Sequence, residues 1–172
     1  MASLQQYSTE RLRLVPTDLV DAPFLLELMN SPKWVKYIGD RGISTIKDAE
    51  AYITNTMIAQ RLKLGFATFT LVRKNDGVKV GTCGLYERDG LDEKDLGYAL
   101  LPQFEGKGYA LEAAKEICTL AKSAFCLTKL QAITTEANLA SKHLLKKLSF
   151  VQTGTIRLPN DETQLLLFTL EL

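Results

Sequence analysis

Alternating polar and apolar residues near the start of the chain predict a strand. Arg11 to Val15 alternates with a period of two and stops at Pro16. After it, apolar residues at helical spacing predict a helix from about Asp18 to Asn30 and a second one from about Ser44 to Leu64. The first third of the chain is therefore expected to be one strand followed by two helices.

The middle of the chain carries a strong hairpin signal. Residues 66–73 and 78–86 are rich in β-forming side chains and flank Asn75-Asp76-Gly77. An Asp-Gly pair between two such runs is typical of a tight turn between antiparallel strands. Residues 94–101 predict a third strand, which ends at Pro102.

The remainder alternates helices with strands. We expect a helix over 108–125, a strand over 130–134, a helix over 138–148 and closing strands over 151–156 and 164–172. The first of these helices carries one apolar face, formed by Leu111, Ala114, Ile117, Cys118 and Ala121. The order β-α-α-β-β-β-α-β-α-β-β is a mixed α/β fold. By the handedness rule, the strands joined through the 108–125 helix should be parallel neighbours.

Length, charge and cysteine content narrow the class of protein. A chain of 172 residues without a linker or repeat is expected to form one domain over 1–172. The net charge is +1 with scattered basic residues, so nucleic acid is not an expected partner. No apolar stretch has the length of a membrane span. Three cysteines without C-x-x-C spacing indicate neither a disulfide framework nor a zinc site, which fits a cytoplasmic protein.

The segment between strand 94–101 and the next helix carries the clearest chemical signal. Gly106 and Gly108 remove side chains just where a helix begins, and Lys107 adds a cation between them. The first N–H groups of a helix lack intrahelical partners and attract anions. Two common phosphate loops are excluded, because Tyr109 stands where a Walker loop needs Ser or Thr and Leu111 where a dinucleotide loop needs Gly or Ala.

The pattern Gln103-x-x-Gly106-x-Gly108 resembles the Q/R-x-x-G-x-G/A loop of the GNAT acetyltransferases. Further motifs in the family's order resemble the branch that acetylates the N-terminal alanine or serine of ribosomal proteins. These are Thr9-Glu10-Arg11-Leu12-Arg13-Leu14, Ser31-Pro32 with Tyr37-Ile38, Asp95-Leu96-Gly97-Tyr98, Gly106-Lys107-Gly108-Tyr109-Ala110-x-Glu112-Ala113, and Asn138-x-x-Ser141 with Lys147-Leu148-x-Phe150. One departure is Ser149, where the family usually has Gly, at an expected helix C-cap.

The resemblance implies a central mixed GNAT-like sheet and acetyl-CoA as cosubstrate, without a metal. In this family two parallel strands splay apart and the pantetheine arm lies between them, so Ala99, Leu100 and Leu101 would offer it backbone groups. Asn138 and Ser141, one helical turn apart, would face the same ligand. N–H groups from Phe104 to Ala110 would hold the pyrophosphate, in a loop and helix start made of Gln103, Phe104, Glu105, Gly106, Lys107, Gly108, Tyr109 and Ala110.

The resemblance also implies catalytic roles, but this chain departs from the family at one catalytic position. Many relatives place a Tyr acid seven residues after the helix Asn, but Leu145 stands there, so the role of proton donor falls to Ser141. Asp95 or Glu87 is the candidate base, although either is equally explained as a surface charge. Trp34 and Tyr37 are candidates for a substrate wall or, alternatively, for simple packing. These two aromatic residues follow the first helix.

The lack of an obvious base bears on the nature of the acceptor. An α-amine with a pKa near 8 is about 10% neutral at pH 7, whereas a lysine amine is below about 0.1% neutral. We therefore expect a protein N-terminal α-amine as the acceptor. The alternatives are a small-molecule amine, such as a polyamine, amino acid or aminoglycoside, and a CoA-binding module without turnover. The oligomeric state is left open between monomer and homodimer.

Overall fold

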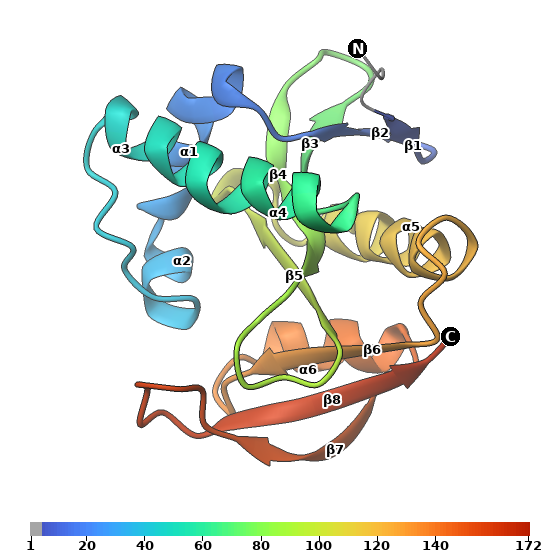
Figure 1. Cartoon of the computed structure of the whole chain (residues 1–172). Helices are drawn as coiled ribbons and strands as arrows, with labels where there is room; N and C mark the ends of the chain where they lie inside the picture. The colour runs from blue at the N-terminus through green and yellow to red at the C-terminus, as the bar shows by residue number, and fades with distance from the viewer. Residues whose placement is uncertain (1–4) are drawn as a thin grey trace.

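The computed structural model describes residues 5–172, which form a mixed sheet with helices on both faces (Figure 1). The eight strands follow the order β1-β2-β3-β4-β5-β6-β8-β7, and all neighbouring pairs are antiparallel except β5 and β6. The strands are β1 (Tyr7–Ser8), β2 (Leu12–Pro16), β3 (Thr68–Arg73), β4 (Lys79–Tyr86), β5 (Lys94–Leu100), β6 (Lys129–Thr134), β7 (Val151–Ile156) and β8 (Leu165–Glu171).

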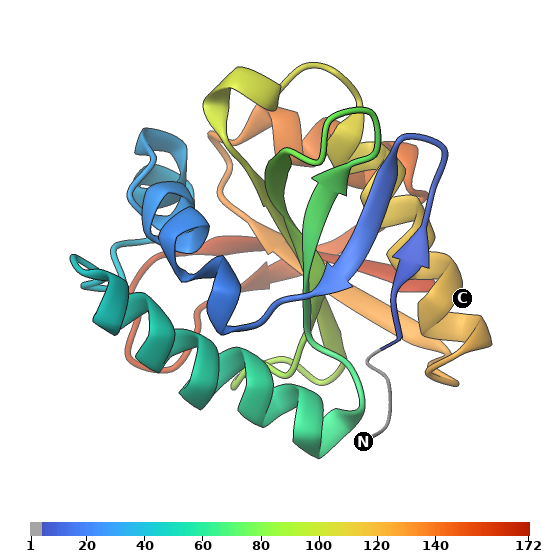
Figure 2. The same ribbon diagram turned by 90° about the horizontal axis from the view of Figure 1, so that it is seen from above.

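The helices form two layers around the sheet. Viewed from above, α1 to α4 lie on one side and α5 on the other (Figure 2). The α-helices are α1 (Ala22–Met29), α2 (Pro32–Tyr37), α3 (Ile46–Tyr52), α4 (Ala59–Leu64), α5 (Tyr109–Ser123) and α6 (Leu139–Lys147). Short 3-10 turns at Leu19–Asp21 and Pro102–Phe104 precede α1 and α5. No helix within the described residues is long and apolar enough to span a membrane.

Most of the elements predicted from the sequence are confirmed, including the mixed α/β class and the parallel pair. The hairpin between β3 and β4 turns at Gly77, whose φ of +74° is in the left-handed region that glycine adopts without steric cost. The Arg73 N–H donates to the Val78 carbonyl across this turn at 2.8 Å. The local Asp-Gly signal was therefore sufficient to fix the turn.

Two short elements were missed. The strand β1 has only two residues, and it exists because Tyr7 and Ser8 pair with Leu14 and Arg13 of β2. The helix α2 has six residues and begins with Pro32, just after the expected end of the preceding helix near Asn30. Pro32 starts a new helix, since its missing N–H is not needed at a first helical position.

The predicted helix over 44–64 is a continuous helix from Ile46 to Leu64, with a wider π-helical turn over Ile53–Ile58. Thr45 caps its start, where the Thr45 hydroxyl accepts from the Asp48 N–H and the Asp48 carboxylate accepts from the Thr45 N–H. Its end is fixed by Gly65, which has a φ of +85°.

The departure at Ser149 leaves the helix cap intact. Ser149 adopts a φ of +68°, the left-handed conformation for which Gly is usually chosen. Its N–H donates to the Lys146 carbonyl, and the Phe150 N–H donates to the Leu145 carbonyl, both at 3.0 Å. These two bonds close α6 in a Schellman motif, so Ser149 serves here as the left-handed residue that ends the helix.

The helix α5 packs its predicted apolar face on the sheet. Ala114, Ile117 and Ala121 are fully buried, whereas Leu111 and Cys118 at the margins of this face are half-buried. The strand β5 precedes this helix and β6 follows it, so the crossover joins the only parallel pair in the described sheet. That pair is where the sheet opens.

Candidate functional site

The strands β5 and β6 pair only at their first residues. Lys94 lies opposite Leu130 and Asp95 opposite Gln131, and no later residues of the two strands are paired. Beyond this point β5 continues beside β4, while β6 continues beside β8. Figure 1 shows the two halves of the sheet running in different directions below β5. The predicted splay between the parallel strands is thus present.

The backbone of β5 presents a free edge to this opening. The Leu101 N–H donates to the Val80 carbonyl at 3.0 Å, toward β4. Successive residues of a strand direct their backbone groups to opposite neighbours, so the N–H of Leu100 faces the side from which β6 has departed. Of the three residues proposed to meet the pantetheine arm, Leu100 therefore offers the unpaired N–H, whereas those of Ala99 and Leu101 point toward β4.

The loop before α5 is shaped by its two glycines. Gly106 has a φ of +69° and Gly108 a φ of +82°, both in the left-handed region. Gly108 occupies the N-cap position of α5, and no side chain caps the helix there. A Cβ at Gly108 would come within 3.2 Å of the Arg11 guanidinium, while one at Gly106 would meet no atom within 4 Å. Both the backbone conformation and the close approach thus favour glycine at 108.

The N–H groups of this loop divide into two sets. Those of Phe104 and Glu105 donate to the Leu101 and Pro102 carbonyls inside the 3-10 turn, so they are already engaged. The first helical bond of α5 is donated by Glu112 to the Gly108 carbonyl. Within residues 5–172, the N–H groups from Gly106 to Leu111 have no acceptor, which leaves a run of donors at the positive end of a 15-residue helix.

The helix α6 follows β6, so its first residues lie on the β6 side of the opening. Asn138 is its N-cap, and the Asn138 side-chain oxygen accepts from the Ser141 N–H at 3.2 Å. Ser141 itself is only 8% exposed. Just before this cap, the Thr135 hydroxyl is buried without a hydrogen-bond partner in the described chain. An unpaired buried hydroxyl beside the opening fits a site that receives a polar ligand.

The Ser141 hydroxyl has a phenol as its neighbour. Burial raises the pKa of Tyr98 on β5, and a hydrogen bond with the Ser141 side chain acts in the opposite direction. Leu145, one turn further along α6, is 2% exposed and belongs to the core. The position at which many relatives carry a Tyr acid is therefore a packing position here, while the Tyr98 side chain of β5 lies near Ser141.

Asp95 lies at the point where the strands separate. It is 2% exposed; one carboxylate oxygen accepts from Arg88 Nε at 2.6 Å, and the other has no partner in the described chain. Burial raises the pKa of Asp95 to about 6, against the opposing effect of Arg88. A buried carboxylate with a raised pKa and a free oxygen is typical of a group that takes part in chemistry.

Next to Asp95, the ring of Tyr86 packs against the backbone of Gly97. Asp95 is opposite Tyr86 in the register of β4 and β5, so the two side chains share a face of the sheet. The Tyr86 ring lies over Gly97, where a Cβ would come within 2.8 Å of a ring carbon. Gly97 thus permits an aromatic ring to lie against the strand next to the carboxylate.

Glu87, the other candidate base, has the surroundings of a surface charge. It forms ion pairs with Lys63 and with Lys94, the latter at 3.2 Å, and its side chain is 41% exposed. Hydrogen bonds from Lys63 and Lys94 lower the pKa of Glu87. A lowered pKa makes a carboxylate a weaker base, so the geometry favours Asp95 over Glu87.

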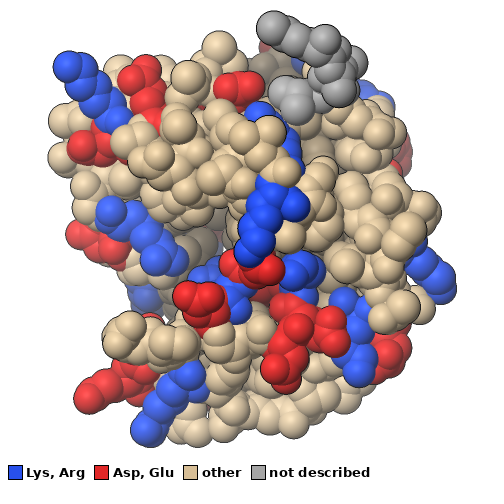
Figure 3. Space-filling model, in the orientation of Figure 1, with Lys and Arg blue, Asp and Glu red and all other residues tan. Residues whose placement is uncertain are grey.

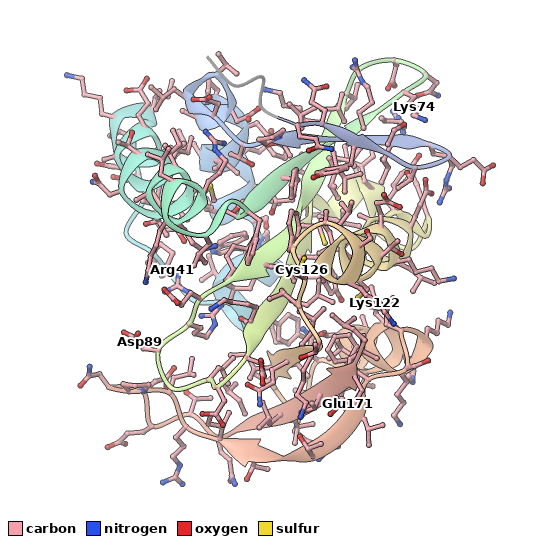
Figure 4. All side chains as sticks on the ribbon, turned by 45° about the vertical axis from the view of Figure 1, so that its right-hand side comes forward. Arg41, Lys74, Asp89, Lys122, Cys126 and Glu171 are labelled. Atoms are coloured by element: carbon pink, nitrogen blue, oxygen red, sulfur yellow. The ribbon has the colours of Figure 1, made fainter. Side chains whose placement is uncertain are left out.

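Two loops lie beside each other at the outer side of this region. Gly90, between β4 and β5, is so close to Pro159, between β7 and β8, that a Cβ at 90 would come within 2.9 Å of the proline ring. Asp89 lies at the outer end of the first loop (Figure 4). Charged side chains of both signs surround a hollow between the two halves of the molecule (Figure 3). The two loops therefore lie against each other at this edge of the molecule.

The two aromatic residues predicted to form a substrate wall lie on α2. Trp34 is 8% exposed and packs in the core, although its indole N–H has no acceptor in the described chain. Tyr37 is half-buried, with the Lys36 ammonium 5.0 Å from its ring centre. Lys33 of the same helix forms an ion pair with Glu105 and so links α2 to the loop before α5. Contact of either aromatic residue with an acceptor stays a prediction.

Sequence reasoning assigned no role to Tyr98, Arg11 or Glu112, although all three occur in the motifs that carried the resemblance. Strand alternation was a usable signal for Tyr98, since it lies two residues before Leu100 on the same strand. No local signal connects Arg11 with Glu112, because the two residues are brought together only by the fold.

Together these features offer backbone donors for an anion, an open strand edge, the Ser141 hydroxyl and a buried carboxylate. The donors and the strand edge fit a phosphorylated cosubstrate with an extended arm, as acetyl-CoA has. The part of the chain that the structure describes contains no cluster of three or more His, Cys, Asp or Glu residues able to hold a metal. The arrangement is suited to acyl transfer between a thioester and an amine.

Comparisons with known proteins agree with this chemistry. The family model described as "Acetyltransferase (GNAT) domain" matches residues 11–151. The chain is 30% identical over 151 residues to an uncharacterized N-acetyltransferase, p20, from Bacillus licheniformis, covering 87% of this chain and 84% of that protein.

Solved structures resemble the chain along nearly its whole length. An acetyltransferase from Agrobacterium tumefaciens str. C58 superposes with a TM-score of 0.81 at 22% identity, covering 100% of this chain and 97% of that one. RimL, a ribosomal L7/L12 alpha-N-protein acetyltransferase in complex with coenzyme A, gives a TM-score of 0.81 at 14% identity, with 98% of each chain covered. At these identities the likeness establishes the fold.

Proposed function

The chain belongs to the GNAT acetyltransferase family and is an acetyl-CoA-dependent enzyme, and on that premise we propose that its acceptor is the α-amine of a protein N-terminus. The proposal is carried by Asp95, the carboxylate at the strand divergence, whose pKa is raised only to about 6. A base of this strength suits an amine that is already partly neutral. An α-amine is about 10% neutral at pH 7, whereas a lysine amine is below about 0.1% neutral.

The likeness of the fold to RimL, whose description names α-N-protein acetylation, is a second support for an N-terminal acceptor. The acceptor enters from the side of the loops at 87–93 and 157–164, next to Asp95. This side carries Asp89, Asp92 and Glu93, which have no ion-pair partner within residues 5–172. Their negative charge attracts a cationic peptide N-terminus.

We propose that acetyl-CoA lies with its pyrophosphate on the N–H groups from Gly106 to Leu111 and with its pantetheine arm along the free edge of β5. The Lys107 ammonium, 5.6 Å from the Phe104 ring centre, adds a mobile cation beside the phosphates. Asn138 and Ser141 border the arm from α6. The N–H of Leu100 then points at the thioester oxygen.

The proposed reaction is a direct attack of the amine on the thioester carbonyl. Asp95 receives a proton from the ammonium by relay through water, because five strand residues, about 16 Å, separate it from Leu100. The neutral amine then forms the new C–N bond. The Leu100 N–H stabilises the negative charge that develops on the carbonyl oxygen. The C–S bond then breaks, and the Ser141 hydroxyl delivers its proton to the departing thiolate while it regains one from the nitrogen of the tetrahedral intermediate. An amide and the CoA thiol are the products.

Replacing Ser141 with Ala is expected to reduce kcat about tenfold with less than about a twofold change in the Kd for acetyl-CoA. The effect is smaller than the usual range for general acid catalysis, because a thiol with a pKa near 8.5 leaves readily. Steady-state rates and calorimetric titration check the two values. Ser123→Ala, at the end of α5, is the matched control, and Tyr98→Phe should reduce kcat in the same direction. An unchanged kcat in Ser141→Ala would contradict the role of proton donor.

The proposed function is tested by incubating the chain and acetyl-CoA with peptides that differ in their first residue, and by reading the products by mass. Each peptide carries one internal lysine, and a matched set has a blocked N-terminus. The proposal expects one acetyl group on free N-termini and none on the blocked set. Acetylation of lysine alone, or of spermidine, amino acids or an aminoglycoside in place of peptides, would overturn the acceptor. Binding of acetyl-CoA without transfer to any amine would indicate a binding module.

A further inference from the structure

Residues 103–108, the loop that we propose to hold the pyrophosphate, are contacted by a residue in the turn between β1 and β2. Arg11 Nη1 donates to the Lys107 carbonyl at 2.9 Å, and Arg11 Nε donates to Glu112 Oε2 at 2.6 Å. The Arg11 guanidinium also lies over the Tyr109 ring, 4.6 Å from its centre. One side chain thus contacts the loop and the first turn of α5 at three separate places.

Glu112 completes this cluster. Its Oε1 accepts from the Thr9 hydroxyl at 2.5 Å and from the Arg11 backbone N–H at 2.8 Å, while Oε2 accepts from the Arg11 side chain. Burial raises the pKa of Glu112, but the hydrogen bonds from Thr9 and Arg11 outweigh it and the pKa is lowered. We call Thr9, Arg11 and Glu112, with their bonds to the loop, the Arg11 brace.

The brace orients one of the donors of the anion site. In a trans peptide the C=O and the following N–H point in opposite directions. Since Arg11 holds the Lys107 carbonyl, the N–H of Gly108 must point away from Arg11, out of the opposite side of the loop. Gly108 has no side chain to resist rotation of this peptide, so an external contact is needed to fix it.

The brace also neutralises a charge that would oppose an anion. Glu112 lies in the first turn of α5, where a carboxylate stabilises the helix but repels a phosphate bound at the same end. Arg11 pairs with this carboxylate at 2.6 Å. Without Arg11, a partly buried negative charge would remain within one helical turn of the donor N–H groups.

A second anion site is a poorer explanation for these basic residues. A cavity of about 310 Å³ opens beside the brace and is lined by Glu10, Arg11, Arg73, Lys74, Asn75 and Tyr109. Its cations are already engaged, because Arg11 pairs with Glu112, Arg73 pairs with Asp76 at 2.6 Å, and Lys74 donates to the Thr9 carbonyl. The charges there hold the protein together and are not free for a ligand.

We infer that Arg11 is a positioning residue for the cosubstrate: it fixes the Lys107–Gly108 peptide and neutralises Glu112, so that the start of α5 accepts the pyrophosphate of acetyl-CoA. Arg11 itself touches no reacting atom. The inference rests on the proposed placement of the pyrophosphate at this loop. It therefore predicts an effect on ligands that carry a pyrophosphate and none on the thioester chemistry.

The test compares acetyl-CoA with acetyl-pantetheine, which has the thioester but no pyrophosphate, by titration followed in NMR spectra. Arg11→Ala is expected to raise the Kd for acetyl-CoA about tenfold and to leave that for acetyl-pantetheine within about twofold. The double variant Arg11→Ala/Glu112→Ala should recover part of the affinity for acetyl-CoA. Its log Kd should be lower than that of Arg11→Ala by about a third of the increase that Arg11→Ala alone causes. With an identified acceptor, KM for acetyl-CoA should rise while kcat stays within about twofold.

Arg13→Ala is the matched control, because Arg13 is exposed on β2 and forms no ion pair within the described residues. Arg11→Lys keeps the charge but cannot bond Glu112 and Lys107 together, so it decides the question if Arg11→Ala does not fold. An intermediate rise in Kd is expected for it.

Equal Kd values for Arg11→Ala, Arg11→Lys and Arg13→Ala would overturn the inference, as would equal weakening of both ligands by Arg11→Ala. If the double variant does not recover affinity for acetyl-CoA, the inference that Arg11 neutralises Glu112 is wrong. The placement of the pyrophosphate is judged separately by Gly108→Asp: if that variant also binds acetyl-CoA normally, the placement itself fails.

Discussion

Gly108→Asp is expected to weaken acetyl-CoA binding by a hundredfold or more. The added carboxylate would lie at the positive end of α5, among the N–H groups proposed to hold the pyrophosphate. Two unit charges 4 Å apart near a protein surface interact by about 4 kcal/mol, and about 2.7 kcal/mol corresponds to a hundredfold in Kd. Isothermal titration with acetyl-CoA measures the loss without any knowledge of the acceptor.

The variant is expected to remain folded. Asp is among the residues that tolerate a left-handed backbone, and a negative charge near a helix N-terminus is favourable to the helix. Gly108→Ala is the matched control: it adds the Cβ near Arg11 and the backbone strain but no charge. We expect Gly108→Ala to lose about tenfold. Equal losses in the two variants would mean that charge is irrelevant at this position, and normal binding by folded Gly108→Asp would contradict the placement of the pyrophosphate.

Asp95→Asn is expected to reduce kcat/KM about a hundredfold at pH 7. Asn keeps the shape and can still accept from Arg88, but it cannot take a proton from the ammonium group of the acceptor. General base catalysis commonly contributes a factor of 10² to 10⁴, and an acceptor that is already partly neutral places this case at the lower end. Initial rates with the preferred peptide at saturating acetyl-CoA measure the effect.

The pH dependence has a defined sign. Asp95 acts as a base only when ionised, and its pKa is about 6, so the rate of the unmodified enzyme should fall as the pH falls through 6. Asp95→Asn should lose this acidic limb and retain only the slow rise with the neutral fraction of the amine. Asp89→Asn, which removes an exposed carboxylate from the adjacent loop, is the control and should keep the limb.

Stability provides an independent measurement of the same group. Folding raises the pKa of Asp95 from 3.8 to about 6, so the folded state binds this proton more tightly than the unfolded state does. The stabilisation is complete below pH 3.8 and is lost as the pH rises through 6, by up to about 3 kcal/mol. Asp95→Asn should therefore melt at the same temperature or higher at pH 8. A lower melting temperature together with full activity would indicate a purely structural role.

Local signals predicted most of the fold. The Asp-Gly turn before Val78 and the two ends of the helix predicted over 44–64 depend on interactions within a few residues, and they occur close to where the sequence places them. The sequence failed at β1 and α2, which are too short for a periodic pattern to develop. The strand β1 forms only because β2 offers it a partner.

In the candidate site, too, some features follow from local sequence signals and others depend on long-range contacts. The glycines before α5 and the start of α6 at Asn138 could be predicted, because a helix start makes the same demands wherever it occurs. The sequence left Asp95 and Glu87 equivalent as candidate bases. Their difference comes from burial and from partners that lie elsewhere in the chain, with Lys63 beside Glu87 and an open strand edge beside Asp95.

The sequence by itself determined the family, the use of acetyl-CoA and the loop that precedes α5, since these depend on short motifs and on helix and strand periods. Only the tertiary structure decided which carboxylate is buried, which hydroxyl lies beside Tyr98, and that Arg11 holds a peptide 96 residues away. Solvation and long-range contacts set a pKa and the orientation of a peptide group, and neither is written in the residues adjacent to it in the chain.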